Sequence, residues 1–218
     1  MVNLKPLLMA GAIALPLQDQ GNWQLLEYRN LPANQVEFLD RGMMVSVDQS
    51  ASPVVYPLEE TTRVARISVS GELMNLLDVR PGSQGLEGED DFSLRIGLVL
   101  AGDRRLNFIE RMISPGWVKT LHSLAPEGAG IDRIVFLNAV QHQSQLGQQR
   151  QHPRSDLIYE RNVWVLDRSG PFELHHELES PYDVVGIWLS LDGDDSRSTY
   201  SMLISSLTLE GPRAELSN

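Results

Sequence analysis

Apolar residues recur at every second position along much of the chain, which is the spacing of an extended strand with one buried face. The clearest segment runs from residue 91 to residue 100 and predicts a strand. Five apolar side chains of this segment would point to the same side: Phe92, Leu94, Ile96, Leu98 and Leu100. A helix would instead place its apolar positions three or four residues apart.

About ten such segments are separated by clusters of Gly, Pro, Asp and Ser, which favour turns. They are residues 23–28, 35–39, 43–47, 64–70, 91–100, 131–140, 162–166, 172–178, 184–191 and 200–209. Only residues 114–124 have the features of a helix, with Ser114 as the N-cap and Pro115 at the first helical position. One short helix cannot cover a sheet, so a second sheet layer is required. We therefore predict an all-β, antiparallel sandwich with one short helix.

The chain of 218 residues is predicted to form one domain over residues 18–210. With 42% hydrophobic and 22% charged residues, its composition is that of a globular protein. Two polar stretches, 80–90 and 141–152, are expected to be long loops, and the second is rich in glutamine. Residues 211–218 are expected to be a loose tail.

Residues 1–17 have the layout of a signal peptide, with Lys5 followed by a short apolar stretch. Ala12-Ile13-Ala14 has the small-x-small form that signal peptidase requires. These features predict export to the periplasm or secretion. The alternative is an apolar N-terminal strand laid on the domain. No later run reaches the roughly 18 apolar residues of a membrane span.

The formal net charge of −11 disfavours nucleic acid and anionic lipid as partners. Cations, neutral sugars and basic protein surfaces remain compatible with this charge. The chain has no cysteine, which excludes disulfides, thiolate zinc sites and thiol nucleophiles.

Acidic residues cluster before one predicted strand and after another. We hypothesise that four of them converge at one end of the sandwich to hold a structural Ca²⁺: Asp90, Asp91, Asp192 and Asp194. Ca²⁺ prefers such hard oxygen donors on turns, although the spacing is not that of an EF-hand. The alternative is that these are ordinary solvated turn carboxylates.

Catalytic signatures are absent from the sequence. It has no G-x-S-x-G elbow, no H-E-x-x-H, no Walker loop and no complete dinucleotide-binding glycine motif. No catalytic residue is therefore predicted. The flat faces of Trp117 and Trp164 are candidates for stacking on sugar rings, whereas Trp188 is expected in the core.

Three segments resemble a bacterial family known as domain of unknown function 3047, over about residues 60–209. They are Glu89-Asp-Asp-Phe-Ser-Leu-Arg-Ile96, then Arg161-Asn-Val163 with Asp167 and Phe172, and then Val184-Val-Gly-Ile-Trp-Leu-Ser-Leu-Asp-Gly-Asp194. The sequence departs from the family pattern at Leu191, at Asp195-Ser196 and at Glu173. The resemblance implies an exported jelly-roll β-sandwich similar to galactose-binding and carbohydrate-binding modules. It implies no established activity.

The recurrent residues of that family and the candidate tryptophans together suggest a ligand-binding set: Arg95, Trp117, Arg161, Asn162 and Trp164. The alternative for the two arginines is structural, with each bridging a carboxylate at the sandwich edge. The preferred function is a module that binds a glycan or another envelope polymer. Two alternatives remain open, a periplasmic hydrolase that uses loop carboxylates and an envelope assembly protein that binds a protein partner.

Overall fold

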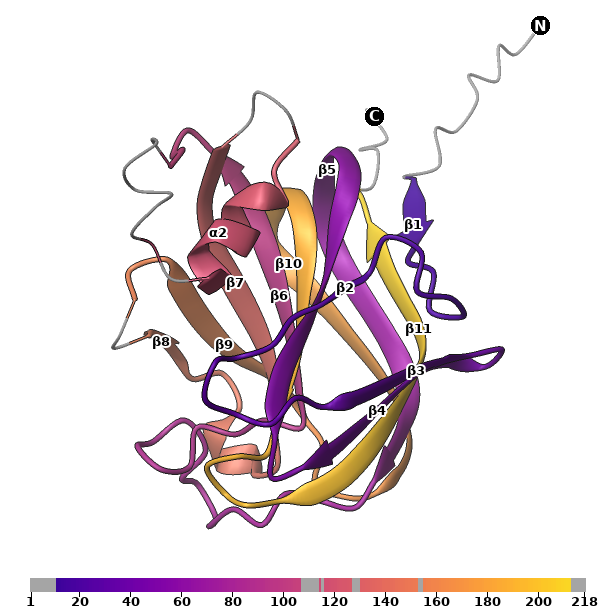
Figure 1. Cartoon of the computed structure of the whole chain (residues 1–218), viewed down its shortest axis with the longest axis vertical. Coiled ribbons are helices and arrows are strands. Elements are labelled where there is room, and N and C mark those ends of the chain that lie inside the picture. The colour runs from indigo at the N-terminus through magenta and orange to yellow at the C-terminus, as the bar shows by residue number, and fades with distance from the viewer. Residues whose placement is uncertain (1–10, 107–113, 115, 127–129, 153–154, 213–218) are drawn as a thin grey trace, which may run out of the picture.

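The protein is an all-β structure with one short helix, as its strand periodicity predicts (Figure 1). The computed structural model describes residues 11–106, 114, 116–126, 130–152 and 155–212. Within these residues, eleven strands form one continuous sheet, in which almost every pair of strands is antiparallel. The exception is the parallel pair formed by the seventh and ninth strands. The predicted fold class, an antiparallel jelly-roll β-sandwich, is confirmed.

The elements follow the predicted segments closely, and the third strand has the predicted bounds. They are β1 (Ala12–Ala14), β2 (Gln24–Leu25), β3 (Gln35–Leu39), β4 (Gly42–Asp48), β5 (Ala51–Met74), β6 (Leu94–Gly102), α2 (Gly116–Ser123), β7 (Gly130–Val140), the 3₁₀ turn η1 (Gln143–Gln145), β8 (Gln149–Gln151), β9 (Ile158–Val165), β10 (Gly170–Asp192) and β11 (Thr199–Glu210). The first half of β5, β1 and β8 were not among the predicted strands. The glutamine-rich loop contains η1 and β8.

Two long strands, β5 and β10, carry the chain from one layer of the sandwich to the other. The first part of β10 pairs with the second part of β5, and the last part of β10 pairs with residues 51–57. Figure 1 shows β5 arching over at the top of the view. The β10 pairing shifts register between Glu177 and Tyr182, where Pro181 has no N–H to donate to the ladder. This irregularity joins the two strands predicted at 172–178 and 184–191 into one.

The first layer has the order β3-β4-β11-β5-β10, and β1 extends it by pairing with β11. The second layer has the order β5-β10-β6-β7-β9-β8, and β2 pairs with the first part of β5. The main core lies between the layers. There Leu94, Ile96 and Leu98 are fully buried, as the alternation of β6 predicts. Phe92, predicted to lie on the same face, is buried just before the strand begins.

A second, smaller core covers part of the outer face of the second layer. Leu121 and Leu124, in and just after helix α2, pack there against Val99, Ile134 and Trp188. Helix α2 corresponds to the helix predicted over residues 114–124, although the predicted role of Pro115 lies outside the described residues. This helix leaves one end of the outer face uncovered.

The described part of the predicted leader packs onto the domain. Strand β1 pairs with residues 208–210 of β11, and Leu15 and Leu17 are buried in the main core with exposed fractions of 5% and 1%. Residues 1–10 of the leader and 213–218 of the tail lie outside the described residues. Cleavage of the leader stays a prediction. None of the described helices is both long enough and apolar enough to span a bilayer.

A chain that starts at Gln18 should be less stable than a chain that starts at Gly11. The shorter chain loses β1 and the burial of Leu15 and Leu17, and full burial of one leucine is worth about 1.5–3 kcal/mol. We expect a loss of at least about 3 kcal/mol in the free energy of unfolding, measured by urea denaturation. Equal denaturation midpoints for the two chains would contradict this role of the N-terminal segment.

Candidate functional site

A cavity of about 400 Å³ lies on the outer face of the second layer, where α2 leaves the sheet uncovered. Strand alternation explains which side chains line it. Since Leu94 and Ile96 point into the main core, Arg95 between them points outward. On β10, Leu189 and Leu191 are in the main core, so the neighbouring outward positions reach the cavity: Trp188, Ser190 and Asp192.

The floor of the cavity consists of side chains from adjacent strands. In one row across β10, β6 and β7, Trp188, Gly97 and Phe136 stand side by side. A Cβ atom at Gly97 would lie 2.8 Å from Cε1 of Phe136 and 2.6 Å from Cδ1 of Ile134. The missing side chain at Gly97 therefore leaves room for the side chains of Phe136 and Ile134 above this position. The other lining comes from Tyr28, Leu31, Trp117 and Leu121, and from residues of the two polar loops.

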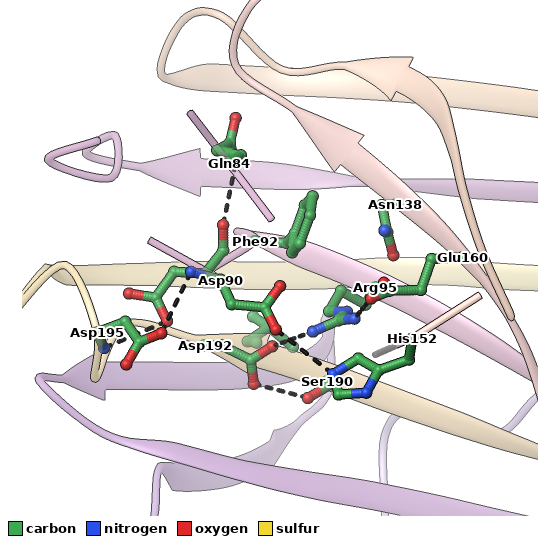
Figure 2. A network of polar contacts seen from close by, with 12 residues as sticks. Gln84, Asp90, Phe92, Arg95, Asn138, His152, Glu160, Ser190, Asp192 and Asp195 are labelled. Atoms are coloured by element: carbon green, nitrogen blue, oxygen red, sulfur yellow. Dashed lines mark hydrogen bonds and ion pairs between the residues drawn. The ribbon is translucent and has the colours of Figure 1, made fainter. Parts of the chain in front are cut away.

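Arg95 is the charged centre of this face. Its guanidinium bonds to the Glu160 carboxylate and lies 3.3 Å from the Asp192 carboxylate. The rings of Phe92 and Phe136 lie 4.8 and 4.9 Å from the guanidinium carbon. Figure 2 shows the side chains of Arg95, Glu160 and Asp192 converging. Removing an arginine from water is costly, and paired carboxylates and aromatic faces offset that cost.

The two predicted polar loops meet at this charged centre. Arg150, from β8, bonds to Glu160 and to the carbonyl of Gly85, and its Nη2 lies 2.7 Å from the Asp90 carboxylate. Nε2 of His152 lies 3.6 Å from the same carboxylate. A continuous series of charged groups therefore links β6 and β9 to both loops at the rim of the cavity.

Asp91 is held by backbone and hydroxyl donors. It is 1% exposed and accepts hydrogen bonds of 2.6 Å from both the N–H and the hydroxyl of Ser196. Burial raises the pKa of Asp91 above its ordinary value, and the Ser196 bonds oppose that shift. This interaction ties the loop after β10 to the segment before β6.

Two other carboxyls in the cavity have strongly raised pKa values. Burial raises the pKa of Asp192 to about 6, although Arg95 acts in the opposite direction. Burial, followed by repulsion from the Asp91 charge, raises the pKa of Asp194 to about 6. The cavity therefore contains more negative charge than its arginine neutralises.

The four acidic residues predicted to converge all line this one cavity: Asp90, Asp91, Asp192 and Asp194. They come together from two loops that lie about one hundred positions apart in sequence. However, no group of three or more acidic or histidine side chains among the described residues is arranged to hold a metal ion. The structural Ca²⁺ stays a prediction without a recognisable ligand set in this part of the chain.

The predicted ligand-binding set divides into two groups. Arg95 and Trp117 line the cavity. Arg161 lies on the opposite side of β9 and pairs with Glu179, its Nη1 being 3.3 Å from the carboxylate. Arg95 and Arg161 therefore each pair with a carboxylate, which is the structural role given above as the alternative to ligand binding. Asn162 donates a 3.2 Å hydrogen bond to the carbonyl of Gln145 and supports the glutamine-rich loop.

Trp164 does not line the cavity because a bulge turns it into the main core. Asn138 of β7 pairs with Asn162, but Ala139 pairs with Trp164, so β9 has one extra residue here. Trp164 is 4% exposed, and its Nε1 donates a 3.0 Å hydrogen bond to the carbonyl of His175. An extra residue in one strand leaves no clear signal in the hydrophobic pattern.

Several lining or supporting residues were not among the predicted site residues: Tyr28, Phe136, Arg150, His152, Glu160, Ser190 and Asp195. One signal for Glu160 exists in the sequence. It occupies a position of β9 that alternates with half-buried side chains, and a carboxylate at such a buried position requires a cationic partner. Sequence alone does not say that the partners are Arg95 and Arg150. Trp188, as predicted, belongs to a core, and it also forms part of the cavity wall.

No protein-family model matches the chain, and neither does any curated protein sequence. Among solved structures of similar fold is the family 11 carbohydrate-binding module of Clostridium thermocellum in complex with a β-1,3-1,4-mixed-linked tetrasaccharide. It is 10% identical, with a TM-score of 0.42 over 93% of this chain and 96% of that chain. The Ca²⁺/Man3GlcNAc-bound exoplasmic/lumenal domain of VIP36 is 10% identical, with a TM-score of 0.40 over 94% and 90%.

The Crh5 transglycosylase in complex with NAG is 11% identical, with a TM-score of 0.36 over 95% of this chain and 87% of that chain. TM-scores below 0.5 at such low identity establish no shared ligand and no shared site. The resemblance to domain of unknown function 3047 also stays a prediction, because no family model matches.

Replacement of Glu160 by alanine should strongly destabilise the protein. The change leaves Arg95 with a single carboxylate partner in a buried position, and breaking a buried ion pair costs about 3–5 kcal/mol. The matched control is Glu179→Ala, which breaks the exposed pair with Arg161 and should cost less than about 1 kcal/mol. Urea denaturation measures the free energy of unfolding of both variants. Equal losses of stability would show that the buried ion pairs of Glu160 contribute no more than the pair of Glu179.

The raised pKa of Asp194 predicts a pH dependence of stability. The folded protein holds the proton of this carboxyl more tightly than the unfolded chain does, because its pKa rises from 3.8 to about 6. Its favourable contribution is therefore complete below pH 3.8 and is lost as the pH rises through about 6. Calorimetry should show Asp194→Asn gaining melting temperature relative to the parent protein as the pH rises across this window. A difference that stays constant with pH would contradict this assignment.

Proposed function

We propose that this protein binds a glycan, and that a sugar unit occupies the cavity on the outer face of the second layer. The observation that carries the proposal is that Trp117, Trp188 and Tyr28 line the same cavity as several carboxylates. Its volume of about 400 Å³ is within the usual range for small-molecule sites, about 300–1,000 Å³. The other described hollows contain one aromatic side chain each, Trp117, Tyr159 or Phe92, whereas several aromatic side chains line this cavity.

The chemistry of the lining suits a sugar ring. The apolar C–H faces of a pyranose pack on flat aromatic rings, while its hydroxyl groups need hydrogen-bond partners. The carboxylate of Asp192 and the hydroxyl of Ser190 lie next to each other, 2.7 Å apart, at the polar end of the cavity. Charge-assisted hydrogen bonds from sugar hydroxyls to such a carboxylate are stronger than bonds between neutral groups.

The surroundings of the cavity favour a polymer over a single sugar. A second hollow of about 720 Å³ lies beside the cavity and shares Trp117, His152 and Ser155 with it. Trp117 therefore stands between two spaces that neighbouring units of one chain would occupy. An oligosaccharide should bind more tightly than a monosaccharide, because the second unit adds contacts without a second loss of rotational and translational freedom.

We also propose that the protein is exported and that its ligand belongs to the cell envelope. The layout of residues 1–17 supports this proposal. Because β1 and Leu17 contribute to the folded domain, N-terminal sequencing of protein from the periplasm and the medium would show whether the exported form retains them. Recovery only from the cytoplasm would contradict export.

A hydrolase that uses loop carboxylates is the second candidate. The favouring observation is that Asp192 and Asp194 line one cavity and both have pKa values raised to about 6. A carboxyl that remains protonated near neutral pH is suited to protonate a glycosidic oxygen. A screen of polysaccharides and chromogenic glycosides tests this candidate. Turnover by the parent protein that disappears in Asp192→Asn, with the fold retained, would support a hydrolase. No turnover by the parent protein would contradict this candidate and leave glycan binding as the proposed function.

Replacement of Trp117 by alanine should weaken glycan binding about tenfold, because stacking on an aromatic face is worth about 0.5–1.5 kcal/mol beyond burial. Trp117 is partly exposed on α2, so its loss should leave the sheet intact. The matched control is Trp117→Phe, which keeps an aromatic face and should retain most of the affinity. Titration calorimetry against envelope and plant oligosaccharides measures this. Equal affinity in the parent and alanine proteins, or no binding to any glycan, would contradict the proposed site.

A further inference from the structure

The charges that line the cavity are unequal. Five aspartates line it: Asp90, Asp91, Asp192, Asp194 and Asp195. The described basic residues that line it are Arg95 and His152. This excess of carboxylates is local, because the five aspartates come to one cavity from two segments about one hundred positions apart in sequence.

Only two of the five carboxylates have a basic partner among the described residues. Asp90 pairs with Arg150 and His152, and Asp192 pairs with Arg95. Asp91, Asp194 and Asp195 form no ion pair with any basic side chain in the described part of the chain. Asp91 is buried and bonded to Ser196, so the negative charges that remain available to a positive group on a ligand are those of Asp194 and Asp195.

Arg95 does not neutralise these unpaired carboxylates. Its guanidinium already binds Glu160 and Asp192, and the Phe92 and Phe136 rings hold it close to the sheet. Arg95 is only 9% exposed, so its charge is used by these partners rather than presented to the cavity. The cavity thus calls for a positive group on the ligand.

A metal ion meets these requirements less well than an organic cation. Calcium takes about six to eight oxygen ligands at about 2.3–2.6 Å. No set of three acidic or histidine groups among the described residues has that convergence. An ammonium group has three N–H donors and binds carboxylates one at a time, so it suits separated oxygens. Aromatic faces such as those of Trp117 and Trp188 also attract an ammonium group.

We propose that the ligand is an amino sugar unit with a free, non-acylated amine, whose ammonium group binds beside Asp194 and Asp195. This inference rests on the proposed glycan-binding function and names its substrate class. The aromatic side chains contact the sugar ring. Acylation of the amine removes its positive charge and adds bulk, so the acylated sugar loses the interaction with the carboxylates.

The test compares oligosaccharides of equal length that differ only at the amine: glucosamine oligomers, N-acetylglucosamine oligomers and neutral glucose oligomers. Titration calorimetry at neutral pH and low salt should show the free-amine oligomers binding at least about tenfold more tightly than the acetylated and neutral ones. Added salt should reduce this preference, because it depends on charge. Melting curves of each variant verify that the fold is retained.

The variant Asp194→Asn removes one of the unpaired carboxylates with little change in volume. It should reduce the affinity for the free-amine oligomer about tenfold more than the affinity for the neutral oligomer. The matched control is Asp183→Asn, which removes an exposed carboxylate that pairs with Arg63 away from the cavity and should change neither affinity.

The outcomes separate the inference from the proposed function. Equal binding of all three oligomers would overturn the amino-sugar inference and leave glycan binding intact, whereas binding of none would overturn both. Titration with Ca²⁺ in the absence of any oligosaccharide is the remaining measurement. Tight Ca²⁺ binding that is lost in Asp194→Asn would show that a metal takes the place assigned to the ammonium group, and would overturn the inference.

Discussion

The long antiparallel pairing of β5 with β10 is the constraint on which the rest of the fold depends. These two strands are continuous through both layers, so one hydrogen-bonded sheet forms both halves of the sandwich. Because each strand alternates its side chains between two faces, the pairing determines which residues enter the main core. It also places Trp188, Ser190 and Asp192 on the outer face, where they meet β6 and helix α2.

On that outer face, one buried arginine organises the polar residues. Arg95 requires negative partners because water is largely excluded from it, and Glu160 and Asp192 provide them from the neighbouring strands. Glu160 in turn binds Arg150, which holds the loop that contains Gly85 and Asp90. A group that stabilises the fold therefore also shapes the cavity. The charge of Arg95 is balanced by Glu160 and Asp192, so Arg95 does not neutralise the other carboxylates of the cavity.

The main elements and part of the site could be predicted from the chain. The alternation in 91–100 correctly assigned Leu94, Ile96 and Leu98 to the core and therefore Arg95 to the opposite face. The four aspartates chosen for their position at strand ends do line one cavity. Trp164, by contrast, entered the core because an extra residue in β9 reversed the face, and a bulge of this kind depends on the partner strand.

The sequence by itself determined which segments are strands, which faces they bury and where the acidic turns stand, because these properties follow from local spacing along the chain. Only the tertiary structure decided that β5 and β10 are each single strands shared by two layers, and that Glu160 pairs with both Arg95 and Arg150. The physical reason is that strand register and ion pairing join residues far apart in sequence, and many pairings satisfy the same local pattern. The cavity is a product of those distant contacts.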